Sequence, residues 1–219
     1  MKKILFIMMA TIIILSGSVS EAKEEKRDIK EDNYLIEQSL NNFFSKGFPE
    51  IQDNLGNNVT VFHKKKIEEF YNSRDFEGAK NYLLDNSISL AWYDGISTRA
   101  SLAKNSSKTF YKLYKSTNYG SIKKEWVVRL SGTFYYDQNK RVVVSVGRPV
   151  LSIEVANFGS GFKPYLASVS TTGTKNGSYG AIFKASYTMK ATMNIKQSGV
   201  TISGTVLFPR DTVSYSSSL

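Results

Sequence analysis

Lysine and tyrosine alternate in one short stretch in a way that suits binding of an anion or a sugar. From position 108 the chain reads KTFYKLYK, and its candidate binding residues are Lys108, Tyr111, Lys112, Tyr114 and Lys115. Aromatic faces beside ammonium groups are favourable for sugars and anionic polymers. The competing interpretation is a short element that packs Phe110, Leu113 and Tyr114 inward while its lysines face water. The pattern favours this second interpretation.

A row of lysines on a predicted long strand is the second candidate surface. Lys184, Lys190 and Lys196 are six residues apart, so all three lie on one face of a β-strand. The row is either a binding face for an anionic partner or a charged edge that prevents strand-to-strand aggregation. The sequence leaves both interpretations open.

Residue types that usually carry catalysis are sparse. His63 is the only histidine and cysteine is absent, which excludes thiol catalysis, disulfides and cysteine-ligated zinc. No nucleophile motif or phosphate-binding loop is present. The acidic doublets, such as Glu68/Glu69, fall in the leader or at helical positions expected to be exposed. Solvation is the ordinary reason for charged residues at such positions. We therefore expect no catalytic residue, no metal site and no cofactor, and a non-enzymatic protein, with a carboxylate-dependent glycan hydrolase as an alternative.

The first residues have the composition of a secretory signal. Lys2 and Lys3 precede an uncharged apolar run from Ile4 to Leu15, and small residues follow. The run is shorter than the roughly 20 residues that a spanning helix needs. We predict a signal peptide over 1–22 and a bacterial protein that is secreted to the extracellular space.

A mainly helical region is predicted over 33–119. The segment 23–32 is charged and nearly free of apolar residues, which predicts a flexible leader. After it, apolar residues recur at helical spacing up to Lys46. Two further helices are expected over 64–73 and 76–84, the second with Asp75 as its N-cap.

Beyond Gly120 the pattern changes to strands. Six apolar-alternating segments follow at intervals of roughly ten residues, with turns between them. The longest unit is a hairpin over 181–208, in which nearly all odd positions from Ala181 to Ile195 are apolar. We predict an α+β fold: a short N-terminal helical region followed by an antiparallel β-sandwich or barrel of about six strands. The β domain covers 120–212, and 213–219 is expected to be a frayed tail.

The length of the hairpin has two explanations. A strand alternating over this length is long enough to cross a bilayer, which makes a membrane-active, pore-forming type of protein an alternative. The ordinary explanation is that the strand bends or bulges and closes the core over Trp126, Leu130 and Ile153. We favour the second, because the neighbouring strands have matching apolar faces.

Charge is distributed unevenly along the chain. The segment 95–219 contains 17 Lys and Arg but only 4 Asp and Glu, a net charge of +13. The leading hypothesis is therefore a secreted binding or structural protein whose basic β domain engages an anionic cell-wall polymer, a glycan or a membrane surface. No specific nucleic-acid partner is expected, because no RNA-binding aromatic signature is present. The oligomeric state is not predicted.

Overall fold

The computed structural model describes residues 21–98, 102–118, 123–159, 161–197 and 200–219. The predicted signal peptide over 1–22 lies outside the described residues except for its last two positions. The chain divides into a unit of residues 1–35 and a unit of residues 36–219. All strands belong to the second unit.

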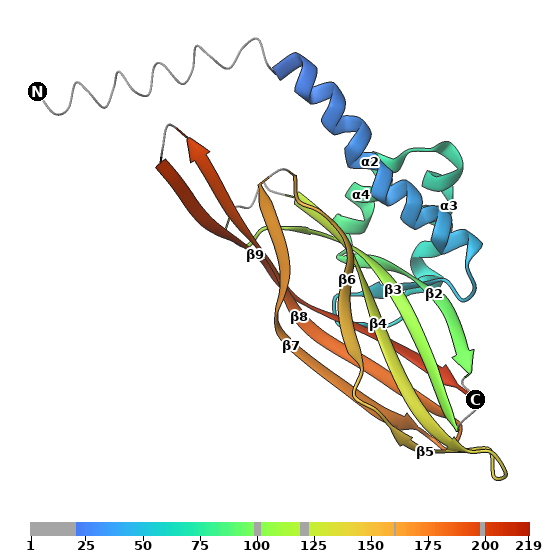
Figure 1. Cartoon of the computed structure of the whole chain (residues 1–219). Coiled ribbons are helices and arrows are strands. Elements are labelled where there is room, and N and C mark those ends of the chain that lie inside the picture. The colour runs from blue at the N-terminus through green and yellow to red at the C-terminus, as the bar shows by residue number, and fades with distance from the viewer. Residues whose placement is uncertain (1–20, 99–101, 119–122, 160, 198–199) are drawn as a thin grey trace, which may run out of the picture. The chain divides into compact units, whose positions relative to one another are not determined.

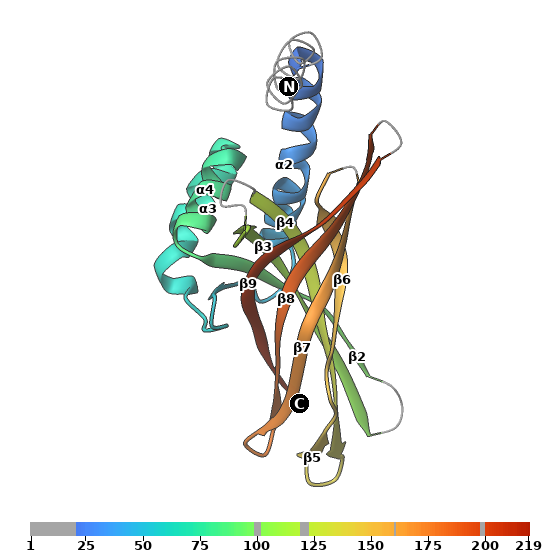
Figure 2. The same ribbon diagram turned by 90° about the vertical axis from the view of Figure 1, so that its left-hand side faces the viewer.

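Two antiparallel sheets form the second unit in the described part of the chain (Figures 1 and 2). The larger sheet has the strand order β1-β2-β3-β4-β5, and β6 also pairs with β4. Its strands are β1 (Glu50–Asp53), β2 (Ile88–Thr98), β3 (Ala103–Lys115), β4 (Lys123–Asp137), β5 (Val142–Val146) and β6 (Val150–Asn157). The smaller sheet has the order β7-β8-β9, with β7 (Phe162–Asn176), β8 (Gly180–Gln197) and β9 (Val200–Ser218). The predicted α+β fold with antiparallel sheets is confirmed.

The two sheets share one hydrophobic core. Alternate side chains of β4 and β8 enter it, and each of the following is fully buried: Trp126, Val128, Leu130, Phe183, Tyr187 and Met189. Burying these large side chains is the main favourable contribution to folding. From Ala181 to Ala191, the apolar face of the predicted hairpin therefore packs in the core, as the ordinary explanation of its length proposes.

Strand β9 continues beyond the predicted end of the hairpin, and a β-bulge lies at that point. Between Leu207 and Arg210 it has one residue more than the facing segment of β8. An extra residue reverses which alternate positions face the core, so Val206 before the bulge and Val213 after it are both buried. The prediction of a frayed tail over 213–219 is wrong, because β9 remains paired with β8 to its last residue.

The β structure also begins earlier than predicted. Strands β1, β2 and β3 all lie within the region 33–119, so the boundary near Gly120 is wrong. The alternation of β3 is hidden because charged residues, Lys108 and Lys112, occupy interior positions. A pattern that relies on apolar residues does not detect such a strand.

Helix α2 (Glu21–Ser45) includes the segment 23–32, where a flexible leader is expected. Glutamate, lysine and arginine in that segment are strong helix formers, and a lack of apolar residues does not oppose a helix. Within residues 36–45, Ile36, Leu40 and Phe43 are fully buried. This is the apolar stripe that the sequence predicts.

Helices α3 (Thr60–Ser73) and α4 (Phe76–Asp85) follow β1. Helix α4 lies against the face of the large sheet opposite the core, where Lys80 Nζ is 3.8 Å from Glu125 Oε1 of β4 (Figure 2). Asp75 Oδ1 accepts a hydrogen bond of 2.8 Å from Gly78 N, so the predicted N-cap is confirmed. Within the described residues, the helices lack the length and apolar character needed to cross a bilayer.

Candidate functional site

Lys108, the first of the predicted binding residues, is fully buried. Its Nζ atom lies 2.6 Å from Glu50 Oε2 and 5.5 Å from the centre of the Tyr93 ring. Burial lowers the pKa of Lys108, and the nearby Glu50 carboxylate partly opposes this change. The charge of Lys108 is therefore balanced inside the fold.

Lys112 and Tyr114 meet the carboxylate of Asp211 between the two sheets. Lys112 Nζ is 3.1 Å from Asp211 Oδ2, and both side chains are almost completely buried. The hydroxyl groups of Tyr114 and Tyr187 donate to Asp211 at 2.9 and 2.8 Å. Trp126 Nε1 in turn donates to the Tyr187 hydroxyl at 3.1 Å. Burial and the adjacent carboxylate raise the pKa of both tyrosines.

Tyr111 points to the opposite face of β3. Its hydroxyl donates to Glu125 Oε2, and Glu125 also faces Lys80 of α4. Both Tyr111 and Glu125 are buried. This contact connects the large sheet to its helical cover and does not present Tyr111 to solvent.

The remaining predicted residues are dispersed. Lys115 and Lys184 are exposed, and Lys190 is partly buried. The side chain of Lys196 lies outside the described part of the structure. The structure therefore does not bring the two predicted groups together: the β3 residues mostly enter the interior, whereas Lys184 is on the outer face of β8. The interpretation in which the lysines of β3 face water is also incorrect for Lys108 and Lys112.

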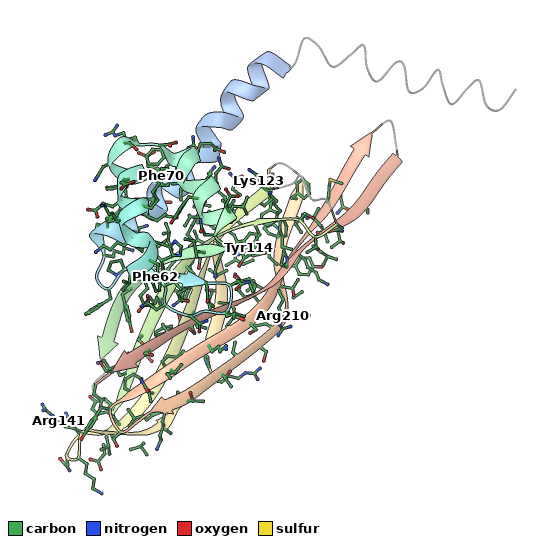
Figure 3. The ribbon with its side chains drawn as sticks, turned by 180° about the vertical axis from the view of Figure 1, so that it is seen from behind. Phe62, Phe70, Tyr114, Lys123, Arg141 and Arg210 are labelled. Carbon is green, nitrogen blue, oxygen red and sulfur yellow. The ribbon has the colours of Figure 1, made fainter. Side chains whose placement is uncertain are left out.

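A pocket of about 620 Å³ lies at the end of the sandwich where β4 turns into β5. It is lined by Lys104, Tyr136, Gln138, Arg141, Tyr179 and Leu219. These residues come from β3, from the end of β4, from the β4–β5 connection, from the residue before β8, and from the residue after β9. Figure 3 shows Arg141 at this end of the sheets, far from the interior position of Tyr114.

Hydrogen bonds hold the pocket together. The Tyr136 amide donates to Leu102 O at 2.8 Å, and the Leu219 amide donates to Tyr179 O at 2.9 Å. Lys104 Nζ donates to Ser218 O at 2.5 Å. The pocket walls are thus joined by hydrogen bonds between segments that are distant in sequence.

The pocket has a basic and aromatic lining. Arg141 is exposed, and its φ of 53° places it in the left-handed region within the β4–β5 turn. Asp137 lies between the lining residues Tyr136 and Gln138 in sequence. Its Oδ1, however, accepts hydrogen bonds from the Asn139 and Lys140 amides and so caps the turn. None of the six lining residues has an acidic side chain. The side chains of the lining can therefore offer donors and cations to an anion, with two tyrosine rings beside them.

Sequence reasoning missed this pocket, because it assigns 137–140 only to a turn. A signal was present: Tyr136 and Arg141 flank that turn directly. The contribution of Tyr179 and Leu219 could not be found in this way, since they are neighbours of the turn only in the folded chain.

No group of three or more metal-ligating side chains of the His, Cys, Asp or Glu type occurs in the part of the chain that the structure describes. The fold and the pocket define the class as a two-sheet antiparallel sandwich with a helical cover and a basic, aromatic pocket at one end. No family model, curated protein or solved structure matches the chain.

Proposed function

We propose that this chain is a secreted, non-enzymatic protein that binds an acidic glycan or cell-wall polymer in the pocket at the β4–β5 end. The observation that carries the proposal is the lining itself: Lys104 and Arg141 beside Tyr136 and Tyr179, with no acidic side chain among the lining residues. A volume of about 620 Å³ lies in the range typical of small-ligand sites.

Each kind of lining residue has a role in the proposed complex. Arg141 can form paired hydrogen bonds with a carboxylate or phosphate, and Lys104 supplies a second positive charge. The tyrosine rings offer flat apolar faces to a sugar ring, and the Gln138 amide can bond to its hydroxyl groups. The net charge of +13 over 95–219 would attract a polyanion from a distance, in a manner weakened by salt.

Two observations favour this function over the alternatives. A glycoside hydrolase needs two carboxyl groups about the substrate, whereas the acidic side chains Glu125 and Asp211 are buried in ion pairs. A pore formed by the hairpin would need Phe183 and Met189 to leave the core in which both are fully buried.

The test is isothermal titration of the secreted protein with three oligomers: oligogalacturonate, glycerol-phosphate oligomer and a neutral glucan. Binding of an acidic oligomer, but not of the glucan, is expected. Arg141→Gln should weaken it about tenfold, the effect of losing one charge-assisted hydrogen-bonding group. Arg148→Gln is the matched control, because Arg148 is also exposed but bonds to Thr171 outside the pocket.

Three results would contradict the proposal: no binding of either acidic oligomer, equal binding of the neutral glucan, or equal losses in the two arginine variants. Added salt should also weaken the complex.

A further inference from the structure

The start of α3 presents apolar side chains to solvent. Val61 is 92% exposed and Phe62 is 79% exposed, and Leu55 in the loop before the helix is 65% exposed. Isolated exposed apolar residues are ordinary on a protein surface, but adjacent large ones at the same turn are less so. Figure 3 shows Phe62 in the helical part of the molecule, away from Arg141 at the pocket.

This helix start is held firmly, so the exposure of Val61 and Phe62 does not come from a frayed end. The Val59 amide donates to Ile51 O at 2.8 Å, and the Ile51 amide donates to Thr60 Oγ1 at 2.8 Å. Further along the same helix, Ile67 is fully buried. The exposed pair is therefore displayed in a fixed position by a helix anchored on its other face.

The preceding loop is also ordered by its own hydrogen bonds. Asp53 Oδ1 accepts from the Leu55 and Asn57 amides at 2.9 and 2.8 Å. Partial burial raises the pKa of Asp53, but these hydrogen bonds outweigh that effect and lower it. The Asp53 carboxylate therefore points toward the backbone of the loop.

Three lysines follow the exposed apolar pair, separated from it only by His63. Lys64, Lys65 and Lys66 are all exposed, and the first turn of α3 contains no acidic residue. Lys66 pairs with Glu69 at 3.0 Å, whereas the described part of the structure shows no ion pair for Lys64 or Lys65. The acidic residues of α3 come only after these lysines, so its first two turns are apolar and basic.

We propose that the start of α3 docks on an anionic lipid surface. Val61 and Phe62 would enter the boundary between headgroups and acyl chains, and Lys64 and Lys65 would face the lipid phosphates. Charge complementarity favours an anionic lipid surface as the partner. Lysines close to exposed apolar side chains are typical of helices that lie on such a surface. The site is separate from the pocket and does not depend on the function proposed for it.

The experiment is cosedimentation of the full secreted chain with sucrose-loaded vesicles. One set contains phosphatidylcholine with phosphatidylglycerol, and the other contains phosphatidylcholine alone. The apolar variant is Val61→Ser with Phe62→Ser, and its control is Val150→Ser with Tyr165→Ser, at exposed positions of β6 and β7. The charge variant is Lys64→Gln with Lys65→Gln, and its control is Lys163→Gln, at an exposed position of β7.

Binding is expected for the anionic vesicles only. The apolar variant should reduce the partition coefficient at least tenfold, and the charge variant should reduce it by roughly tenfold or more. All four substituted positions of α3 are exposed, so circular dichroism should show an unchanged fold. The control variants and Arg141→Gln should bind like the parent.

Several results would overturn the proposal. These are absence of binding, equal binding to neutral vesicles, and losses that are the same in the α3 variants and their controls. Full competition by free glycerol phosphate would assign the lysines to a soluble phosphate ligand instead. A loss seen only with Arg141→Gln would assign the vesicle binding to the pocket.

Discussion

At the scale of single residues, the charge network around Asp211 shows how the interior tolerates ions. The Asp211 carboxylate receives hydrogen bonds from Lys112, Tyr114 and Tyr187, and from the amide of Thr212 at 2.8 Å. Removing a charge from water is unfavourable unless a partner and further hydrogen bonds compensate. Here the donors come from both sheets, so the network stabilises one arrangement of β3 against β9.

Replacing Lys112 with methionine should therefore destabilise the fold strongly. The change would leave the Asp211 charge buried without its cation, which typically costs about 3–5 kcal/mol of unfolding free energy. Lys115→Met is the control, because Lys115 is on the same strand but exposed. Urea denaturation followed by tryptophan fluorescence measures the difference.

The double variant Lys112→Met with Asp211→Asn should recover part of that loss, since it removes the unpaired charge. Equal stabilities of the Lys112 and Lys115 variants would show that the buried ion pair contributes little.

At the scale of elements, small irregularities decide how the strands pack. The bulge at Phe208 and Pro209 turns Asp211 inward, so the charge network depends on one extra residue in β9. Proline suits such a position, because it lacks the backbone N–H donor that a regular ladder requires. In β4, Gly132 takes an inward position over which the Phe183 ring of β8 lies.

Gly132→Ala should destabilise the protein by about 1–3 kcal/mol through overpacking. A Cβ atom at Gly132 would lie 2.3 Å from the Phe183 ring, too close for any real contact. Gly47→Ala is a matched control, because a Cβ atom there has no neighbour within 4 Å. Thermal unfolding by circular dichroism compares the two variants.

A smaller side chain at position 183 tests whether the Phe183 ring causes this destabilisation. In a background of Phe183→Leu, the Gly132→Ala substitution should be less harmful than in the parent. An unchanged penalty in that background would mean that the ring is not the obstacle.

At the scale of the whole molecule, protonated tyrosines connect both sheets and make stability depend on pH. Tyr114 is in β3 and Tyr187 is in β8, and burial raises the pKa of each above the ordinary value of 10.0. The unfolded chain loses these protons first as the pH rises. Their contribution is therefore complete below pH 10 and declines above it. The lowered pKa of Lys108 acts in the opposite sense, because its neutral form is favoured in the folded protein.

The free energy of unfolding should fall above about pH 10, by up to roughly 1.4 kcal/mol per pH unit for each buried tyrosine. Tyr114→Phe should be slightly less stable at pH 8, because one hydrogen bond is lost, and should decline less steeply above pH 10. Tyr165→Phe, at an exposed position of β7, should follow the parent. Urea titrations from pH 8 to 11 provide the curves, and parallel curves for Tyr114→Phe and the parent would contradict the assignment.

The sequence by itself determined where most strands of the C-terminal half lie and which face of β8 is buried. Alternation is a local property, so the odd positions of β8 from Ala181 to Ala191 can be assigned to the core without knowing their partners. The apolar stripe within residues 36–45 of α2 and the Asp75 cap are local in the same sense. These features are determined by neighbouring residues, which the sequence shows directly.

Only the tertiary structure decided the role of the charged residues. Lys108 and Lys112 resemble surface lysines in sequence, and their carboxylate partners, Glu50 and Asp211, are on other strands far along the chain. Whether a lysine faces water or a buried acid depends on which strands become neighbours, and no local pattern encodes that. For the same reason the pocket residues are scattered in sequence and meet only when β3, β4 and the ends of β8 and β9 come together.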